Sequence, residues 1–157
     1  MSEPVTEEEQ LKARLEAARQ KTAEFERRRE ERLETQQLRD QVEDAERQAR
    51  LEEAIADAEA EHGALGRHIK VVHAIYDDEH IRGSMIIKRP NPLIFKRFRD
   101  TGSMKSKDIE KLWCSCLVWP DKSSVESMIE ELPHTELKLA NACADLAGAS
   151  KKEIAGK

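Results

Sequence analysis

Aromatic residues are scarce in this chain, and they are unevenly placed. Only six of its 157 residues are Phe, Trp or Tyr, and five of these six follow residue 66. Phe25 is the only aromatic residue before that point. A segment with so few large apolar side chains cannot bury enough surface to fold as a globule. We therefore expect the packed core to lie in the C-terminal part.

Cysteines and long apolar runs are also few. Three cysteines are an odd number, which excludes a complete set of intrachain disulfides and favours a reducing compartment. No apolar run approaches the roughly 20 residues that span a bilayer. The first ten residues, MSEPVTEEEQ, are acidic and polar, unlike the basic and apolar start of a signal peptide. We expect a cytoplasmic protein with no membrane association.

The charge differs between the two parts of the chain. Residues 1–65 contain 11 basic and 19 acidic residues, whereas residues 66–157 contain 16 basic and 13 acidic residues. The net charge of the whole chain is -5. This acidic balance argues against general binding of nucleic acid.

The first part predicts one long helix. Between Thr6 and Glu61 there is no Gly and no Pro, and strong helix formers dominate. Thr6 followed by three glutamates is typical of a capping box at a helix start. Gly63 or Gly66 is suited to end the helix, because glycine readily adopts the left-handed conformation. Residues 1–65 are thus expected to form an extended helical segment.

Apolar residues in this segment recur at coiled-coil spacing, in runs that are out of frame with one another. The expected seam residues are Leu11, Leu15, Phe25, Leu38 and Val42. One interpretation is a coiled coil that binds a second copy or another helix. The other is a solvated helix that is stabilised by charge pairs along its surface. The pattern indicates a helix but does not identify its partner.

The second part predicts a small α+β domain over residues 66–150, followed by a polar tail at 151–157. β-branched residues over 69–76 and 81–88 indicate a hairpin, and Gly83 indicates a bulge or close packing within it. Three or four short helices are expected, over 93–100, 106–117, 125–131 and 135–146. The fold class is therefore α+β, mainly α. The expected core is Val71, Ile75, Ile86, Phe95, Phe98, Leu112, Trp113, Cys116, Leu117, Met128, Leu132, Leu139, Cys143 and Leu146.

No metal, cofactor or catalytic site is predicted. Cys114, Cys116, Cys143 and His134 are the residues closest to a metal-binding set, but structural zinc sites use paired C-x₂-C spacings. The C-x-C here lies within an apolar run, so buried thiols are the favoured interpretation. The five histidines are scattered, and no glycine-rich phosphate loop is present. We expect a protein that is not an enzyme.

A basic segment near residue 96 allows two interpretations. Lys96, Arg97 and Arg99 alternate with Phe95 and Phe98, an arrangement that could bind phosphates with aromatic stacking. The aromatic spacing of three residues is, however, typical of a helix face that points into a core. The favoured interpretation is that the three cations form the solvated face, which suits an acidic protein partner better than a nucleic acid.

Three C-terminal segments form a characteristic succession: GSMIIKRPNPLIFKRF at 83–98, CLVWPD at 116–121 and LPHTELKLANACADLAG at 132–148. This succession resembles the tail assembly chaperones of long-tailed bacteriophages. The resemblance covers roughly residues 66–150. It implies a protein without enzymatic activity that coats the long helical tape measure protein in the host cytoplasm until the tail tube polymerises. The long N-terminal helix departs from the compact pattern of that family.

The resemblance also implies roles for particular residues. Phe95, Phe98, Trp113 and Trp119 would be the core or contact aromatics, and the seam residues of the helix would contact the partner. Two alternatives remain open. One is a structural component of the virion or scaffold that associates through its coiled coil. The other is a regulator that binds nucleic acid through the basic segment around Arg97.

Overall fold

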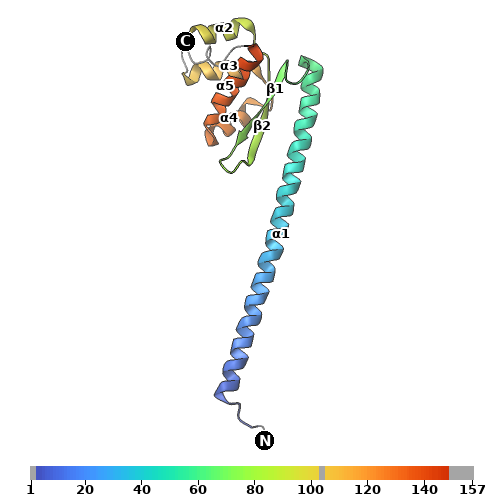
Figure 1. The fold of residues 1–157 in the computed structure, drawn as a ribbon, viewed down its shortest axis with the longest axis vertical. Helices are drawn as coiled ribbons and strands as arrows, with labels where there is room; N and C mark the ends of the chain where they lie inside the picture. Colours follow the sequence, from blue (N-terminus) through green and yellow to red (C-terminus); the bar gives the residue numbers. More distant parts are fainter. Residues whose placement is uncertain (1–2, 103–104, 149–157) are drawn as a thin grey trace. The chain divides into compact units, whose positions relative to one another are not determined.

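The computed structural model describes residues 3–102 and 105–148. The chain divides into two compact units, residues 1–46 and residues 47–157. The first unit contains most of a single helix, and the second contains its end together with a small sheet and four further helices (Figure 1). The α+β, mainly α class predicted from the sequence is confirmed. The predicted polar tail at 151–157 lies outside the described residues.

Helix α1 spans Glu7–His62. Its start is a capping box, as predicted: the backbone N–H of Glu9 donates to Thr6 Oγ1 at 3.3 Å, and the N–H of Thr6 donates to Glu9 Oε2 at 3.2 Å. Its end is set by Gly63, whose φ of 111° is open to glycine and strained for other residues. The predicted helix and both of its boundaries are confirmed.

The sheet has three antiparallel strands in the order β1-β2-β3. The predicted hairpin is confirmed as β1 (Ile69–Ile75) and β2 (Ile81–Lys88). β3 (Leu117–Trp119) was not predicted. The sequence placed Leu117 at the end of a helix, but the helix ends at Cys116. Leu117 and Trp119 then pair with Ile87 and Ile86 of β2.

Both faces of the sheet are covered, which explains where the core lies. Leu51 and Ala58 of α1 pack with Ile69 and Ile86 on one face. On the other face, alternate residues of β1 and β2 join the larger cluster formed by the remaining helices. The last third of α1 is therefore part of the domain. This packing explains why the units separate near residue 46, whereas the change in composition lies near residue 65.

The four remaining helices cover the second face of the sheet. They are α2 (Pro92–Asp100), α3 (Ser106–Cys116), α4 (Lys122–Glu131) and α5 (His134–Ala147). All four were predicted, with small differences at the ends. Most of the predicted core is buried, but four of its members are only partly buried: Val71, Ile75, Leu117 and Leu132.

Gly83 allows the β1–β2 hairpin to pack closely against α4. A side chain at this position would collide with Met128 of α4, because an added Cβ would lie 2.6 Å from Met128 Cε. The pairing of the two strands also becomes irregular next to it, between Ala74 and Ile75. Gly83 therefore serves both close packing and an irregular ladder, as its place in the sequence predicted.

Candidate interaction surfaces

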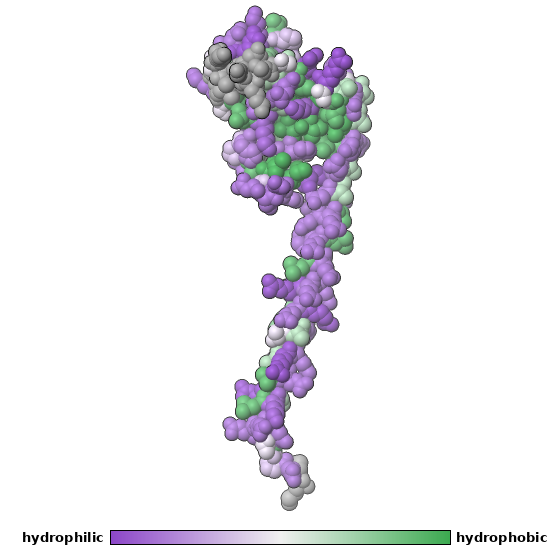
Figure 2. All heavy atoms as spheres, in the orientation of Figure 1, coloured by the Kyte–Doolittle hydropathy of each residue, from purple (hydrophilic) through white to green (hydrophobic). Residues whose placement is uncertain are grey.

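Within the first unit, α1 carries large apolar side chains that no other described residue covers. Every described residue up to Glu46 is exposed. The exposed fractions of Leu11, Leu15, Phe25 and Leu33 are 54%, 52%, 63% and 54%. Figure 2 shows separate green, hydrophobic patches along a helix surface that is largely purple and hydrophilic. Single exposed leucines are common on protein surfaces, so their alignment along the helix is the informative property.

These side chains fall on two different sides of the helix. At about 100° per residue, Leu11, Leu15, Phe25 and Leu33 lie within roughly 40° of one line, which we call the N-terminal stripe. Leu38 is 27 residues beyond Leu11, or about seven and a half turns, so it lies on the opposite side. The expected seam residues therefore form two stripes, in keeping with the out-of-frame runs of the sequence, and Leu33 belongs to the first of them.

The second stripe belongs to an acidic stretch of the helix. Leu38 and Val42 are 61% and 47% exposed. They lie within residues 38–46, which contain four acidic residues and one basic residue and which we call the acidic segment. Arg39, Glu43 and Glu46 share one side of the helix, because they follow the i, i+4, i+7 spacing of one helix face. Arg39 and Glu46 border the apolar stripe, whereas Glu43 is turned about 100° or more away from Leu38 and Val42.

The polar surface of α1 is organised by pairs one turn apart. Lys12 binds Glu8 at 2.8 Å, and Arg28 binds Glu24 at 2.6 Å. Gln36 Nε2 donates to Asp40 Oδ1 at 2.9 Å. Exposed pairs of this kind stabilise a helix by about 0.3–0.5 kcal/mol each. They support helix formation in this segment and leave its apolar stripes uncovered.

The basic residues predicted to bind a partner lie on α2. Lys96, Arg97 and Arg99 are exposed, and the neighbouring Phe95 and Phe98 are buried. The predicted division of this helix into a core face and a solvated face is therefore confirmed. Because both phenyl rings pack in the core, they do not form an exposed platform for stacking bases.

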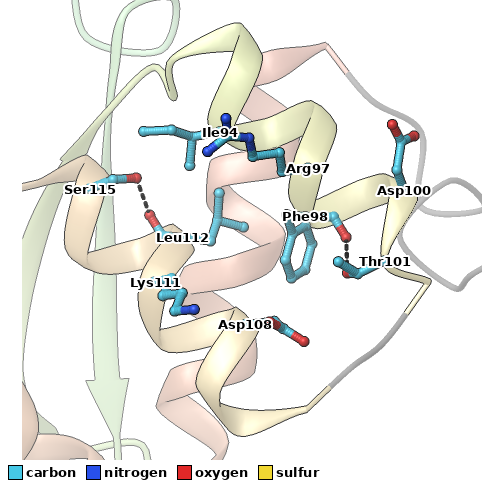
Figure 3. A pocket seen from close by; sticks show the side chains of 9 residues that line it. All are labelled: Ile94, Arg97, Phe98, Asp100, Thr101, Asp108, Lys111, Leu112 and Ser115. Atoms are coloured by element: carbon cyan, nitrogen blue, oxygen red, sulfur yellow. Dashed lines mark hydrogen bonds between the residues drawn. The ribbon is translucent and has the colours of Figure 1, made fainter.

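A groove lies between α2 and α3 in the second unit, and it was not predicted from the sequence. It has a volume of about 680 Å³. Ile94 and Phe98 of α2 and Leu112 of α3 supply its apolar lining (Figure 3). Six further residues complete the lining: Arg97, Asp100, Thr101, Asp108, Lys111 and Ser115. Arg97 is the only member of the predicted set that lines the groove. We call this hollow the α2–α3 groove.

The cysteines are arranged as packing residues. Cys116 and Cys143 are buried, as predicted, while Cys114 is partly exposed. A hydrogen bond between the thiols of Cys116 and Cys143 lowers the pKa of Cys116 and raises the pKa of Cys143. Burial raises the pKa of Cys114. In the described ranges, no three His, Cys, Asp or Glu side chains are placed so that they could hold a metal ion.

Polar contacts in the interior serve the fold. His73 Nδ1 and Ser84 Oγ lie 2.7 Å apart across the hairpin, and burial together with the nearby Lys138 lowers the pKa of His73. Thr135 Oγ1 is buried and has no hydrogen-bond partner among the described residues. None of the helices in the described ranges combines the length and the apolar character needed to cross a bilayer.

No protein-family model, curated protein or solved structure matches this chain. The function of the chain is therefore inferred from the surfaces described above.

Proposed function

We propose that this chain is a non-enzymatic phage tail assembly protein that binds a long helical tape measure protein and shields its apolar side chains until the tail forms. The observation that carries the proposal is the N-terminal stripe: four large apolar side chains, each more than half exposed, aligned on a helix with no buried residue over its first 40 positions. The resemblance of the C-terminal domain to tail assembly chaperones supports the identity of the partner.

The physics of the stripe supports a helical partner. From Leu11 to Leu33 the stripe runs for about 33 Å along the helix axis. Burying apolar surface contributes about 25 cal/mol per Å², and a second amphipathic helix is the simplest partner that can cover a straight, narrow line of side chains. A tape measure protein presents apolar faces of this kind over a great length.

A structural subunit of the virion would show the same exposed stripe, so the experiment must separate the two roles. The tagged full-length chain is expressed in cells producing phage, and both its bound proteins and the finished particles are identified by mass spectrometry. The proposal expects the tape measure protein to copurify and the chain to be absent from finished particles. Retention in particles at a fixed copy number would make it a structural subunit instead.

A direct test of the stripe uses paired variants. Leu15→Asp with Phe25→Asp places two carboxylates on the N-terminal stripe. Ala13→Asp with Ala17→Asp places two carboxylates on the other side of the same helix and serves as the matched control. The proposal expects the first pair to stop recovery of the tape measure protein and the second pair to leave it unchanged.

A further inference from the structure

The charged residues that border the N-terminal stripe are almost all cations. At about 100° per residue, six charged residues of the stretch 11–33 lie within roughly 80° of the line through Leu11. Five of them are basic and one is acidic: Arg14, Arg19, Lys21, Arg29 and Arg32, with Glu26. The other charged residues of this stretch, three basic and four acidic, lie on the rest of the helix surface. The side of the helix that carries the stripe is therefore positive, and the opposite side is nearly neutral.

The ion pairs of the helix do not involve these five cations. Lys12, Arg27 and Arg28 each pair with a glutamate one turn away, at 2.8, 3.9 and 2.6 Å. Those three residues lie about 100° or more from the line through Leu11. None of the five cations beside the stripe makes an ion pair or a hydrogen bond with a residue in the described ranges. Their charge is therefore available to a partner that covers the stripe.

This charge pattern argues against a second copy of the chain as that partner. Two N-terminal stripes laid on each other, parallel or antiparallel, would bring the five cations of one chain against the five of the other. Like charges that face each other across a helix pair are destabilising, and a single Glu26 in each chain is too little to offset them. The surface instead fits a partner of opposite charge.

We propose that the helix bound by the N-terminal stripe is an acidic one, with Asp and Glu side chains on both sides of its apolar seam. The seam covers the stripe, and the carboxylates pair with the cations beside it. Both sides are needed, because Arg19 lies on one side of the stripe and Arg14, Lys21 and Arg32 lie on the other. The proposal rests on the proposed function for the helical nature of the partner, and it adds the charge by which that partner is recognised.

The test uses two synthetic helical peptides, each about four heptads long, with leucine at both core positions of every heptad. One peptide has glutamate at the two positions that border the core, and the other has lysine there. Like charges keep each peptide from pairing with itself at neutral pH. Fluorescence anisotropy of the labelled peptides measures their affinity for the purified full-length chain. We expect the acidic peptide to bind at least tenfold more tightly than the basic peptide, and this preference to shrink as the salt concentration rises to about 1 M.

Paired variants of the chain locate the binding surface. Arg14→Glu with Arg29→Glu leaves equal numbers of basic and acidic residues beside the stripe. Lys12→Glu with Arg27→Glu makes the same charge change two positions earlier in each case, on the other side of the helix, and is the matched control. We expect the preference for the acidic peptide to fall to threefold or less in the first variant and to stay at least tenfold in the control. Circular dichroism verifies that both variants are as helical as the native chain.

The same measurements can overturn the proposal. Equal affinity for the two peptides, tighter binding of the basic peptide, or no binding of either would contradict it. Tighter binding of a DNA duplex of similar length would assign the cations to phosphate groups instead. Self-association of the native chain in sedimentation velocity, lost in the Leu15→Asp, Phe25→Asp variant, would make a second copy the occupant of the stripe.

The outcomes separate this proposal from the proposed function. A native chain that prefers the acidic peptide but does not bind a tape measure protein would retain this proposal and contradict the proposed function. Equal binding of the tape measure protein by the native chain, the Arg14→Glu, Arg29→Glu variant and the control would support the proposed function and contradict the acidic partner.

Discussion

The phenol of Tyr76 donates a hydrogen bond of 2.6 Å to Oε1 of Glu131, and Arg82 binds Oε2 of the same carboxylate. These contacts fasten the turn end of the β1–β2 hairpin to α4. Both donors favour the ionised carboxylate, and they lower the pKa of Glu131, the hydrogen bond from Tyr76 being the larger cause. The same hydrogen bond is the largest cause that raises the pKa of Tyr76.

Glu131→Gln is expected to lower the melting temperature at neutral pH. A carboxyl group whose pKa is lowered by folding adds stability above its ordinary pKa, about 4.3, and this stability is lost as the pH falls through the lowered value. The difference in melting temperature between the native chain and the variant should therefore shrink as the pH falls below about 4. Glu130→Gln, a change at the exposed neighbour, is the matched control and should leave the melting temperature at neutral pH nearly unchanged. An equal difference at pH 7 and pH 3 would contradict this explanation.

Gly83→Ala is expected to destabilise the domain by about 1 kcal/mol, the low end of the cost of overpacking, because the new methyl group must displace the flexible thioether end of Met128. Chemical denaturation of the variant measures this cost. Met128→Ala removes the colliding atoms, so the double variant should be more stable than the sum of the two single effects predicts. Strictly additive effects would show that the contact between residues 83 and 128 is unimportant.

Leu51→Ala is expected to cost about 2–5 kcal/mol, as is usual when a buried leucine is truncated. Its side chain packs with Ile69 and Ile86 on one face of the sheet, so the variant weakens the attachment of the last third of α1. Leu38→Ala, an exposed change on the same helix, should alter stability by less than about 0.5 kcal/mol. Equal costs at the two positions would place residue 51 outside the core.

The three cysteines should differ in their reaction with a thiol reagent. Cys114 is partly exposed and should react first, although its raised pKa slows the reaction relative to a free cysteine. Cys116 and Cys143 are buried and should react only when the domain opens. Mass spectrometry of the chain during labelling identifies the order. Simultaneous labelling of all three under native conditions would contradict the packing described here.

The sequence predicted those elements whose local signals agree with one another. The capping box at Thr6, the hairpin over Ile69–Lys88 and the amphipathic pattern of α2 each contain their own start, stop or period. β3 was missed because Leu117–Trp119 continues the apolar run of α3, and an apolar run of this length fits a helix or a strand equally well. The pairing of these residues with β2 in the folded domain determines that they form a strand.

The interaction surfaces were less accessible to sequence reasoning. Leu51 and Ala58 share the spacing of a coiled-coil seam, yet they pack against the chain's own sheet. The α2–α3 groove was not foreseen because Phe98 and Leu112 come from separate helices and meet only in the folded domain. The division of the exposed residues of α1 into two stripes agrees with the out-of-frame apolar runs of the sequence, and the helical angle from Leu11 to Leu38 places the second stripe opposite the first.

The central claim is that the N-terminal stripe binds another long helix. Its most direct measurement is the affinity of the full-length chain for purified tape measure protein, compared between the Leu15→Asp, Phe25→Asp variant and the Ala13→Asp, Ala17→Asp control. We predict specific binding by the native chain and the control, and at least a tenfold weaker affinity for the stripe variant. Equal binding by all three proteins, or no binding by the native chain, would contradict the claim.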